Sequence, residues 1–194
     1  MKEFVKIILT LTVFYNHRQY MLQIENIKLR AVEPEDIDFI LDMENDIDLW
    51  NVSNTHNPFS RFDIEQYVML ADKDIYSAKQ VRYIIEDLSN LSRIGMVDVF
   101  DFDAHNRRAG IGILLVKEAR KKGAASITLK IIINYLFEQL SIHQVYCNIN
   151  ATNTDSIKLF ESQGFTKIGL KKDWNLVNSN WVDVGLYQLI NSNQ

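Results

Sequence analysis

The sequence predicts an α/β protein in which helices flank one mixed, mainly antiparallel sheet of about seven strands. Three observations support this prediction. Alternating and helically spaced apolar segments follow one another in the order β-α-α-β-β-β-α-β-α-β-β. Short polar turns join neighbouring strands, which favours antiparallel hairpins. The one long helical segment lies between two strands, where it predicts a parallel crossover.

The first part of the chain predicts a strand and two helices. Residues 24–32 alternate well enough for a strand, and Pro34 then opens an amphipathic helix over 35–46 with acids in its first turn. Residues 61–72 repeat the helical spacing. The stretch 48–59 between these two helices is predicted to be a loop.

The rest of the chain predicts six strands and two helices. The first two strands form a hairpin around "LSNLS". Asn153 is expected to cap the last helix and Gly164 to end it. In chain order, these elements are strands over 80–87, 92–103 and 108–116, a long helix over 123–140, a strand over 144–150, a short helix over 153–165, and two strands within 166–190.

Composition limits the class of protein. At 194 residues and 47% hydrophobic, the chain fits one domain with a single sizeable core. A net charge of -4 argues against a general nucleic-acid partner. The lone cysteine, Cys147, excludes an internal disulfide framework, and the four histidines show no metal-ligand spacing, so no metal is expected. We expect a cytoplasmic protein without a membrane partner.

The N-terminal segment is expected to stand apart from the domain. Residues 1–22 are assigned as an extension of uncertain status and residues 23–194 as the domain. The apolar run near the N-terminus is interrupted by Lys6 and is too short to span a bilayer. It could be an added strand or helix, or translated sequence upstream of a natural start at Met21.

Residues 120–125, "RKKGAA", lie between an apolar strand and the long helix. The unpaired N–H groups and the dipole of a helix N-terminus favour an anion at such a place. Gly123 lets the backbone approach a ligand closely, and Lys121 and Lys122 add positive charge. The same residues are also compatible with an ordinary solvated start of a basic helix.

Four motifs in register resemble one protein family. R-x-x-G-x-A after a strand and before a long helix resembles the pyrophosphate loop of the GCN5-related N-acetyltransferase (GNAT) superfamily, and "NATNTDSIKLFESQGF" resembles its next motif. "LRAVEPEDIDFILDMEND" and "VDVFDFDAHNRRAGIGILL" resemble the branch containing spermidine and ribosomal-protein N-terminal acetyltransferases. The resemblance covers about residues 24–190 and implies the GNAT fold, with a splayed central pair of strands.

The resemblance implies acetyl-CoA as the co-substrate. The pyrophosphate would sit on the backbone amides of 120–125, and the splayed strand would offer backbone groups to the pantetheine arm. Asn153 matches an asparagine that contacts the cofactor, although it could equally act only as the helix cap. The implied cofactor-binding residues are Ile113, Leu114, Leu115, Arg120, Lys121, Lys122, Gly123, Ala124, Ala125, Asn153, Ser156 and Phe160.

Three positions depart from the pattern of the family. Phe160 stands where many members carry a tyrosine that protonates the leaving thiolate. Gly110 stands where relatives often have a glutamate, and Asn148 where protein N-terminal acetyltransferases can place a catalytic glutamate. The site would therefore use water and backbone groups, or its acidic groups lie elsewhere.

Acidic and aromatic residues supply candidates for the acceptor side. Asp101 matches a position near the amine site in polyamine-acetylating relatives, and its alternative is a solvent-facing acid at a strand end. Alternation predicts that Asp101 and Asp103 share one strand face and that Asp98 points the other way. The expected substrate-binding residues are Glu44, Trp50, Asp101 and Asn148. Other aromatic residues expected near the acceptor cleft or in the core are Phe59, Trp174 and Trp181.

The implied activity is direct transfer of an acetyl group from acetyl-CoA to a primary amine. The acceptor could be a polyamine, a peptide N-terminus or a small-molecule amine. The backbone N–H of Leu115 would stabilise the oxyanion, and Asp101 is the candidate catalytic carboxylate. The alternative is a non-catalytic acyl-CoA-binding module of the same fold. The chain could also form a homo-oligomer.

Overall fold

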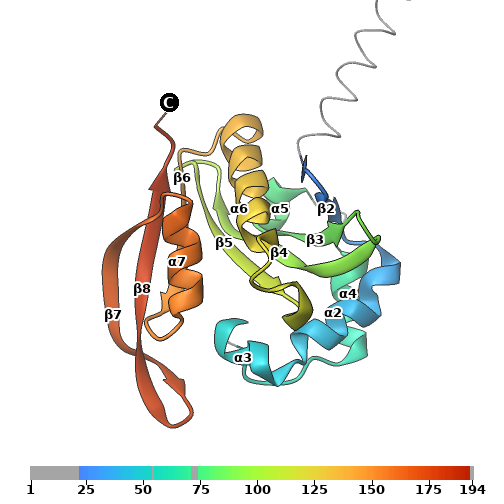
Figure 1. Cartoon of the computed structure of the whole chain (residues 1–194), viewed down its shortest axis with the longest axis horizontal. Coiled ribbons are helices and arrows are strands. Elements are labelled where there is room, and N and C mark those ends of the chain that lie inside the picture. The colour runs from blue at the N-terminus through green and yellow to red at the C-terminus, as the bar shows by residue number, and fades with distance from the viewer. Residues whose placement is uncertain (1–21, 54, 71–73, 193–194) are drawn as a thin grey trace, which may run out of the picture.

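The computed structural model describes residues 22–53, 55–70 and 74–192, which form one sheet with helices on both faces (Figure 1). The strands are β1 (Gln23–Ile24), β2 (Ile27–Ala31), β3 (Val81–Asp87), β4 (Ser92–Asp103), β5 (Arg108–Leu115), β6 (Gln144–Asn150), β7 (Thr166–Val177) and β8 (Asn180–Ile190). The helices are α2 (Ile37–Glu44), α3 (Ile47–Ser53), α4 (Arg61–Met69), α5 (Ile75–Ala78), α6 (Ala124–Asn134) and α7 (Thr154–Ser162). Short helical turns precede α2 and α6 and follow α6: η1 (Pro34–Asp36), η2 (Lys117–Ala119) and the π-helical η3 (Tyr135–Gln139).

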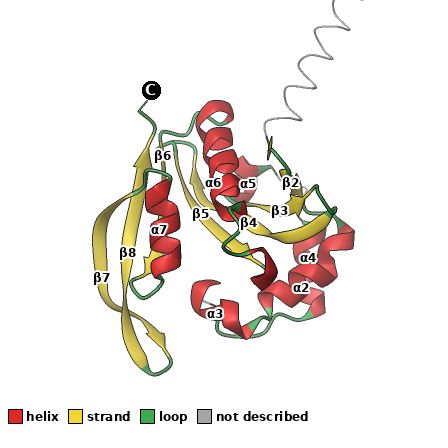
Figure 2. Ribbon diagram, viewed as in Figure 1, coloured by secondary structure: helices red, strands yellow, loops and turns green. Residues whose placement is uncertain are grey.

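The sheet has eight strands in the order β1-β2-β3-β4-β5-β6-β8-β7. The pairs are antiparallel except that β5 and β6 run parallel, joined by the crossover through α6. The predicted fold class is therefore confirmed (Figure 2). The strand beyond the expected seven is β1, a two-residue strand that pairs with β2.

The structure differs from the predicted elements at three places. The stretch predicted as a loop over 48–59 contains α3, whose polar residues hid its helical spacing. The helix predicted over 123–140 is α-helical only to Asn134 and then widens into the π-helical turn η3. Helix α5 was not predicted, because four residues are too few to show a period. The predicted N-terminal extension lies outside the described residues, apart from Leu22.

The two faces of the sheet carry separate apolar clusters. On β3, Ile84 packs with α2 and α4, whereas its neighbours Tyr83 and Ile85 pack with α6 on the other face, as strand alternation requires. The α2–α4 side also takes up Met96 of β4 and Leu49 of α3. Figure 1 shows α2 and α4 together at one side of the molecule and α7 at the other.

The sheet divides into two halves between β5 and β6. Their parallel pairing runs only from Arg108–Gln144 to Gly110–Tyr146. Beyond that point β5 stays paired with β4, and β6 stays paired with β8. The segments 111–115 and 147–150 therefore diverge, which is the splayed strand pair that the resemblance implied.

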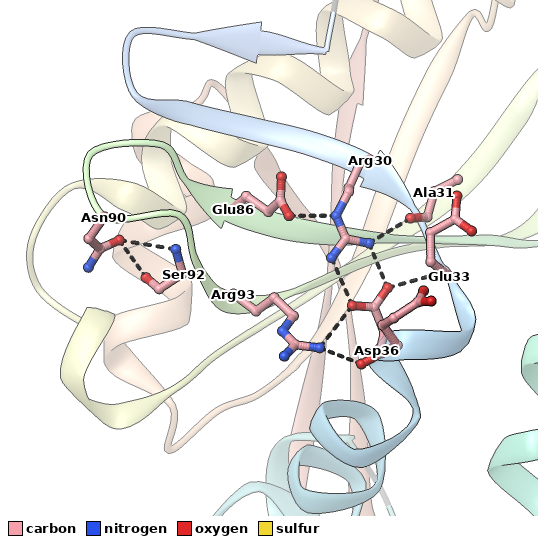
Figure 3. A network of polar contacts seen from close by, with 9 residues as sticks. Arg30, Ala31, Glu33, Asp36, Glu86, Asn90, Ser92 and Arg93 are labelled. Carbon is pink, nitrogen blue, oxygen red and sulfur yellow. Dashed lines mark hydrogen bonds and ion pairs between the residues drawn. The ribbon is translucent and has the colours of Figure 1, made fainter.

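An ionic cluster fixes helix α2 to the sheet (Figure 3). The fully buried Asp36 carboxylate accepts hydrogen bonds from Arg30 Nη1 at 2.6 Å and Nη2 at 2.8 Å, from Arg93 Nη1 at 3.2 Å, and from the Glu33 N–H at 2.9 Å. Arg30 also donates to Glu86 at 2.6 Å. Burial opposes the charge of Asp36, but the hydrogen bonds from Arg30 and Glu33 outweigh it and lower the pKa of this carboxyl.

Asp36→Asn is expected to lower the free energy of unfolding by about 2 kcal/mol, because it leaves two arginines without their shared anion. The effect stays below that of a fully buried pair, since the side chain of Arg93 is 38% exposed. Urea unfolding followed by circular dichroism measures it. The matched control is Asp38→Asn, because Asp38 is paired with Arg61 on the surface and should contribute little.

The same cluster sets a direction for the effect of acid. Because the folded pKa of Asp36 is below its ordinary value of 3.8, its contribution is present above that pH and is lost as the pH falls through the folded value. The stability difference between wild type and Asp36→Asn should therefore shrink on acidification below about pH 4. A difference that stayed constant or grew at low pH would contradict the ionic role of Asp36.

Candidate active site

The divergence of β5 from β6 opens a cavity of about 1040 Å³. The splayed strands and α7 form the first wall, and the β7–β8 hairpin continues it beside β6. Across the cavity lie α2, α3, residues 55–59, Asp63 of α4, β3 and β4. The lining residues of the first wall are Ile111, Gly112, Ile113, Leu114, Cys147, Asn148, Ile149, Asn150, Asn153, Ser156 and Phe160.

The backbone of β5 directs alternate residues into the gap. Val116 N–H donates to a β4 carbonyl at 3.0 Å, and an antiparallel ladder alternates bonded and non-bonded pairs. By this alternation Leu114 is bonded to β4, whereas Ile113 and Leu115 direct their backbone groups toward the gap. The Leu115 carbonyl accepts a hydrogen bond from Arg120 Nε at 3.0 Å. Of the three β5 residues predicted to contact the cofactor, Ile113 and Leu114 line the cavity, whereas the buried Leu115 is not among the lining residues.

The loop after β5 has the backbone shape of an anion site. Gly123 precedes α6 with φ 86°, and Lys121 is also left-handed with φ 61°. Ile127 N–H donates to the Gly123 carbonyl at 3.1 Å, which closes the first turn of α6. Among the described residues, the N–H groups of 124–126 have no backbone acceptor, as at other helix starts. Ala124 is buried and Ala125 half-buried, whereas the exposed residues are Arg120, Lys121, Lys122 and Gly123.

Part of the positive charge of this loop is already paired. Lys121 Nζ lies 3.5 Å from Asp155 Oδ2 at the start of α7, with both side chains largely exposed. Such a surface pair contributes little and can rearrange around a ligand. The side chain of Arg120 holds the end of β5 through the bond to Leu115.

Helix α7 brings the second family motif to the cavity. Asn153 caps the helix by accepting from the Ser156 N–H at 3.1 Å, so the predicted cap is confirmed. Both residues also line the cavity. Phe160 is 4% exposed and packs edge-on against Phe165 at 5.1 Å between ring centres. A cofactor role for these residues stays a prediction.

A buried ion cluster occupies the α2 side of the cavity. Arg82 of β3 donates to both oxygens of Asp98, at 2.6 and 2.8 Å, and to Glu44 Oε1 at 2.5 Å. Its guanidinium also lies over the Tyr67 ring at 5.5 Å. Burial opposes the charge of Arg82, but the two carboxylates outweigh it and raise the pKa of this side chain above its ordinary value.

The opposite rim carries a lysine held among amide and aromatic groups. Lys171 of β7 donates to Asn148 Oδ1 at 3.1 Å, and its ammonium lies 4.8 Å from the centre of the Trp174 ring. Asn175 donates to Asn150 at 2.8 Å on the same rim. Asn148 therefore faces the cavity, with its amide oxygen engaged by a cation.

The Phe100 ring explains the glycine at position 110. A Cβ atom at Gly110 would overlap this ring, which also packs edge-on against Tyr146. The place where relatives often carry a glutamate is thus closed by an aromatic side chain from β4. At Gly112, by contrast, a Cβ would lie 3.7 Å from the ring, in ordinary contact.

Asp101 lies at a bulge rather than in regular β4. The register between β4 and β5 shifts between Phe100 and Asp103, and Asp101 has φ 49°. Its carboxylate accepts from Tyr146 Oη at 2.8 Å, and burial together with this bond raises the pKa of Tyr146 to about 12. The bulge interrupts the regular pairing between Asp101 and Asp103, whereas Asp98 and Asp101 lie on different sides, as the alternation predicted. Asp98 lines the cavity, whereas Asp101 is not among the lining residues.

Some of the remaining candidate residues line the cavity, and others only hold the elements around it. Trp50 Nε1 donates to the Glu44 carbonyl at 2.8 Å, so this tryptophan fixes α3 to the end of α2 and is not among the lining residues. Phe59 and Trp174 line the cavity, whereas Trp181 is an exposed residue of β8. Cys147 is buried in the wall, and burial raises the pKa of its thiol to about 12, which disfavours a nucleophile.

Sequence reasoning missed Arg82 and Lys171. Arg82 left a signal, because it is a charged residue in the otherwise apolar strand segment "VRYII", and such a buried charge needs a partner. Lys171 left none, because it is one of two adjacent lysines and only the fold distinguishes them.

Among the described residues no group of His, Cys, Asp or Glu could hold a metal ion. In the described part of the chain, none of the helices has both the length and the apolar character needed to cross a membrane.

Comparison with known proteins identifies the family. The model of the acetyltransferase (GNAT) domain matches residues 26–166. An uncharacterised N-acetyltransferase of the SPbeta prophage from Bacillus subtilis is 30% identical over 145 residues, covering 75% of this chain and 78% of the relative. The chain therefore belongs to the GNAT family of N-acetyltransferases, as the sequence motifs implied.

Three further matches are to proteins with named activities. Spermidine N(1)-acetyltransferase of Vibrio cholerae is 26% identical over 164 residues, which cover 84% of this chain and 92% of the relative. The crystal structure of that spermidine acetyltransferase with CoA and spermine matches with TM-score 0.78 at 24% identity, covering 85% of this chain and 95% of that one. A ribosomal-protein-S5-alanine acetyltransferase from Vibrio fischeri matches with TM-score 0.76 at 19% identity, covering 88% and 96%.

Gly110→Ala is expected to lower the free energy of unfolding by about 2 kcal/mol, because the new methyl group forces the Phe100 ring out of place. The matched control is Gly112→Ala, which should cost clearly less. Replacing Phe100 by leucine should recover much of the loss in the double variant. Equal destabilisation by the two glycine variants, measured by urea unfolding, would contradict the proposed closure of position 110.

Proposed function

We propose that this N-acetyltransferase takes the acetyl group from acetyl-CoA and transfers it directly to a primary amine. The observation that carries the proposal is that three features adjoin one another. They are the helix-start loop at Gly123, the backbone groups of β5 that face the gap, and the cavity beyond them. The CoA bound to the matching Vibrio cholerae structure supports the same assignment.

The donor end is held chiefly by backbone. The pyrophosphate lies on the free N–H groups of the first turn of α6, where the helix dipole favours an anion. The pantetheine arm follows the gap along β5 and meets Ile113 and Leu115. Asn153 and Ser156 border its path from α7. The N–H of Leu115 is the donor placed to stabilise the oxyanion of the tetrahedral intermediate.

The chemical step needs a neutral amine and releases a thiolate. The amine nitrogen forms the new C–N bond, the C–S bond breaks, and the proton lost by the nitrogen ends on solvent or on the departing sulfur. Deprotonating an alkylamine of pKa about 10.4 near neutral pH costs roughly 4 kcal/mol. Phe160 cannot protonate the thiolate, but a thiol of pKa about 8.5 leaves readily without an acid.

No side chain at the three departing positions handles a proton. Position 110 is filled by Phe100, Asn148 is bound to Lys171, and Phe160 is apolar. We assign the rate mainly to positioning and to the backbone oxyanion donor. Asp101 is hydrogen-bonded to Tyr146, and neither residue lines the cavity, so a catalytic role for Asp101 would require a water or substrate group between it and the amine. The alternative function, an acyl-CoA-binding module without turnover, is favoured by the same three substitutions.

Gly123→Asp is expected to raise the KM for acetyl-CoA at least about tenfold, because it places a carboxylate against the pyrophosphate. Gly123→Asn is the matched control, since Asn has the same shape and tolerates the same left-handed backbone without the charge. Release of CoA thiol and mass of the acetylated amine are measured with a panel of primary amines. Equal KM values for the two variants would remove the pyrophosphate role of this loop.

The panel also separates catalysis from binding alone. An acetylated amine formed in proportion to the thiol released supports transfer. Binding of acetyl-CoA with no product from any amine would favour the non-catalytic module.

A further inference from the structure

We propose that the acceptor is an amine with a single positive charge and an apolar or aromatic body, and that Lys171 disfavours polyamines. This inference rests on the proposed acetylation of an amine in the cavity, and it names the class of amine. It is carried by the charges that line the cavity and by the apolar residues at its rim.

The charge of the cavity is nearly balanced. Within the described part of the chain, three carboxylates and two cations line it: Glu44, Asp63, Asp98, Arg82 and Lys171. The net formal charge is therefore -1 with His56 neutral. A polyamine carries several ammonium groups and needs several unpaired carboxylates to hold them. The wall has an excess of one negative charge, which matches one ammonium group.

The location of that excess charge is the Glu44–Arg82–Asp98 cluster. Arg82 is shared by the two carboxylates and satisfies both oxygens of Asp98 but one oxygen of Glu44. Glu44 is 8% exposed, so its charge acts in a poorly solvated wall where one ammonium group is attracted strongly. Asp63 contributes less, because its carboxylate accepts from the Ser60 backbone and hydroxyl at 3.0 and 2.7 Å.

Lys171 places a positive charge on the opposite rim. Its ammonium donates to Asn148 and lies over the face of Trp174, at the solvent-exposed edge of the cavity. A second ammonium group on a long acceptor would approach this charge, and the neighbouring amides of Asn150 and Asn175 on the same rim carry no charge to offset it. Like charges repel one another even where solvent screens part of the repulsion, so a polyamine is disfavoured relative to a monoamine.

The rim is apolar where a polyamine site would be acidic. Val52, Phe59 and Trp174 line the cavity although they are 48%, 40% and 59% exposed. Phe59 is fixed there, because Asn45 bonds both its N–H and its carbonyl, at 2.8 and 2.9 Å. Apolar side chains grouped at the mouth of a cleft are typical of a site for an apolar ligand. They would pack against the body of the amine.

Calorimetry tests the charge argument on the protein saturated with CoA. The probes are phenethylamine, a monocation with an aromatic body, and spermidine. We expect phenethylamine to bind at least about tenfold more tightly than spermidine. Lys171→Glu should reduce this ratio about tenfold by improving spermidine binding. The matched control, Lys172→Glu, makes the same charge change on an exposed neighbour that does not line the cavity, and it should leave the ratio unchanged.

Two results would overturn the charge argument. One is tighter binding of spermidine than of phenethylamine by the wild-type protein. The other is an equal change of the ratio in the Lys171 and Lys172 variants. Because the readout is affinity, it is separate from turnover. Failure to form any acetylated amine would count against the proposed transfer, whereas a reversed affinity ratio would count against this acceptor class.

Trp174→Ala tests the apolar rim. We expect phenethylamine affinity to fall about tenfold, as for loss of an aromatic contact, while the mass measured by sedimentation stays constant. The alternative occupant of this surface is a second copy of the chain. The interface would then consist of the rim and two neighbouring exposed residues of the β7–β8 hairpin, Leu176 and Trp181. Unchanged amine affinity with a smaller mass would assign the rim to that interface and overturn this part of the proposal.

Discussion

The end of parallel pairing between β5 and β6 is the constraint on which the site depends. Up to Gly110 and Tyr146 the two strands share hydrogen bonds, and beyond them each keeps only its outer neighbour. The gap leaves the backbone groups of Ile113 and the N–H of Leu115 without a strand partner, and such groups need a ligand or water. The Leu115 carbonyl is already bonded to Arg120. The same divergence makes the cavity and directs β5 toward the loop at Gly123. A sheet paired throughout would bury all of these groups.

The second wall of the cavity depends on ionic contacts between separate elements. Asp36 and its two arginines fix the start of α2 to β2 and β4 (Figure 3), and the other end of that helix carries Glu44 into the cavity. Arg82 then joins Glu44 to Asp98 on the sheet. The helix is thus anchored at both ends by buried charges. These pairs add positional specificity, although each one costs much of its Coulomb energy in lost hydration.

The order of the elements, the loop at Gly123 and the cap of α7 could be predicted from the sequence, because each depends on residues that are close together in the chain. The splayed strand followed from the family resemblance rather than from periodicity. The wall opposite it was not readable. Arg82 meets carboxylates far away in the chain, and the bulge at Asp101 appears only in the register of β4 and the backbone angle of one residue. Likewise, only the register of β7 distinguishes Lys171 from Lys172. Contacts across the fold determine these features, and local pattern does not record them.

The central claim is that the gap beside β5 and the loop at Gly123 together hold acetyl-CoA. The most direct measurement is calorimetric titration of the protein with acetyl-CoA and, separately, with acetyl-pantetheine, which lacks the pyrophosphate and the nucleotide. The account predicts micromolar binding of acetyl-CoA and binding of acetyl-pantetheine that is weaker by at least about a hundredfold, because the helix N-terminus then has no anion to hold. Equal affinity for the two ligands, or no binding of acetyl-CoA by folded protein, would contradict it.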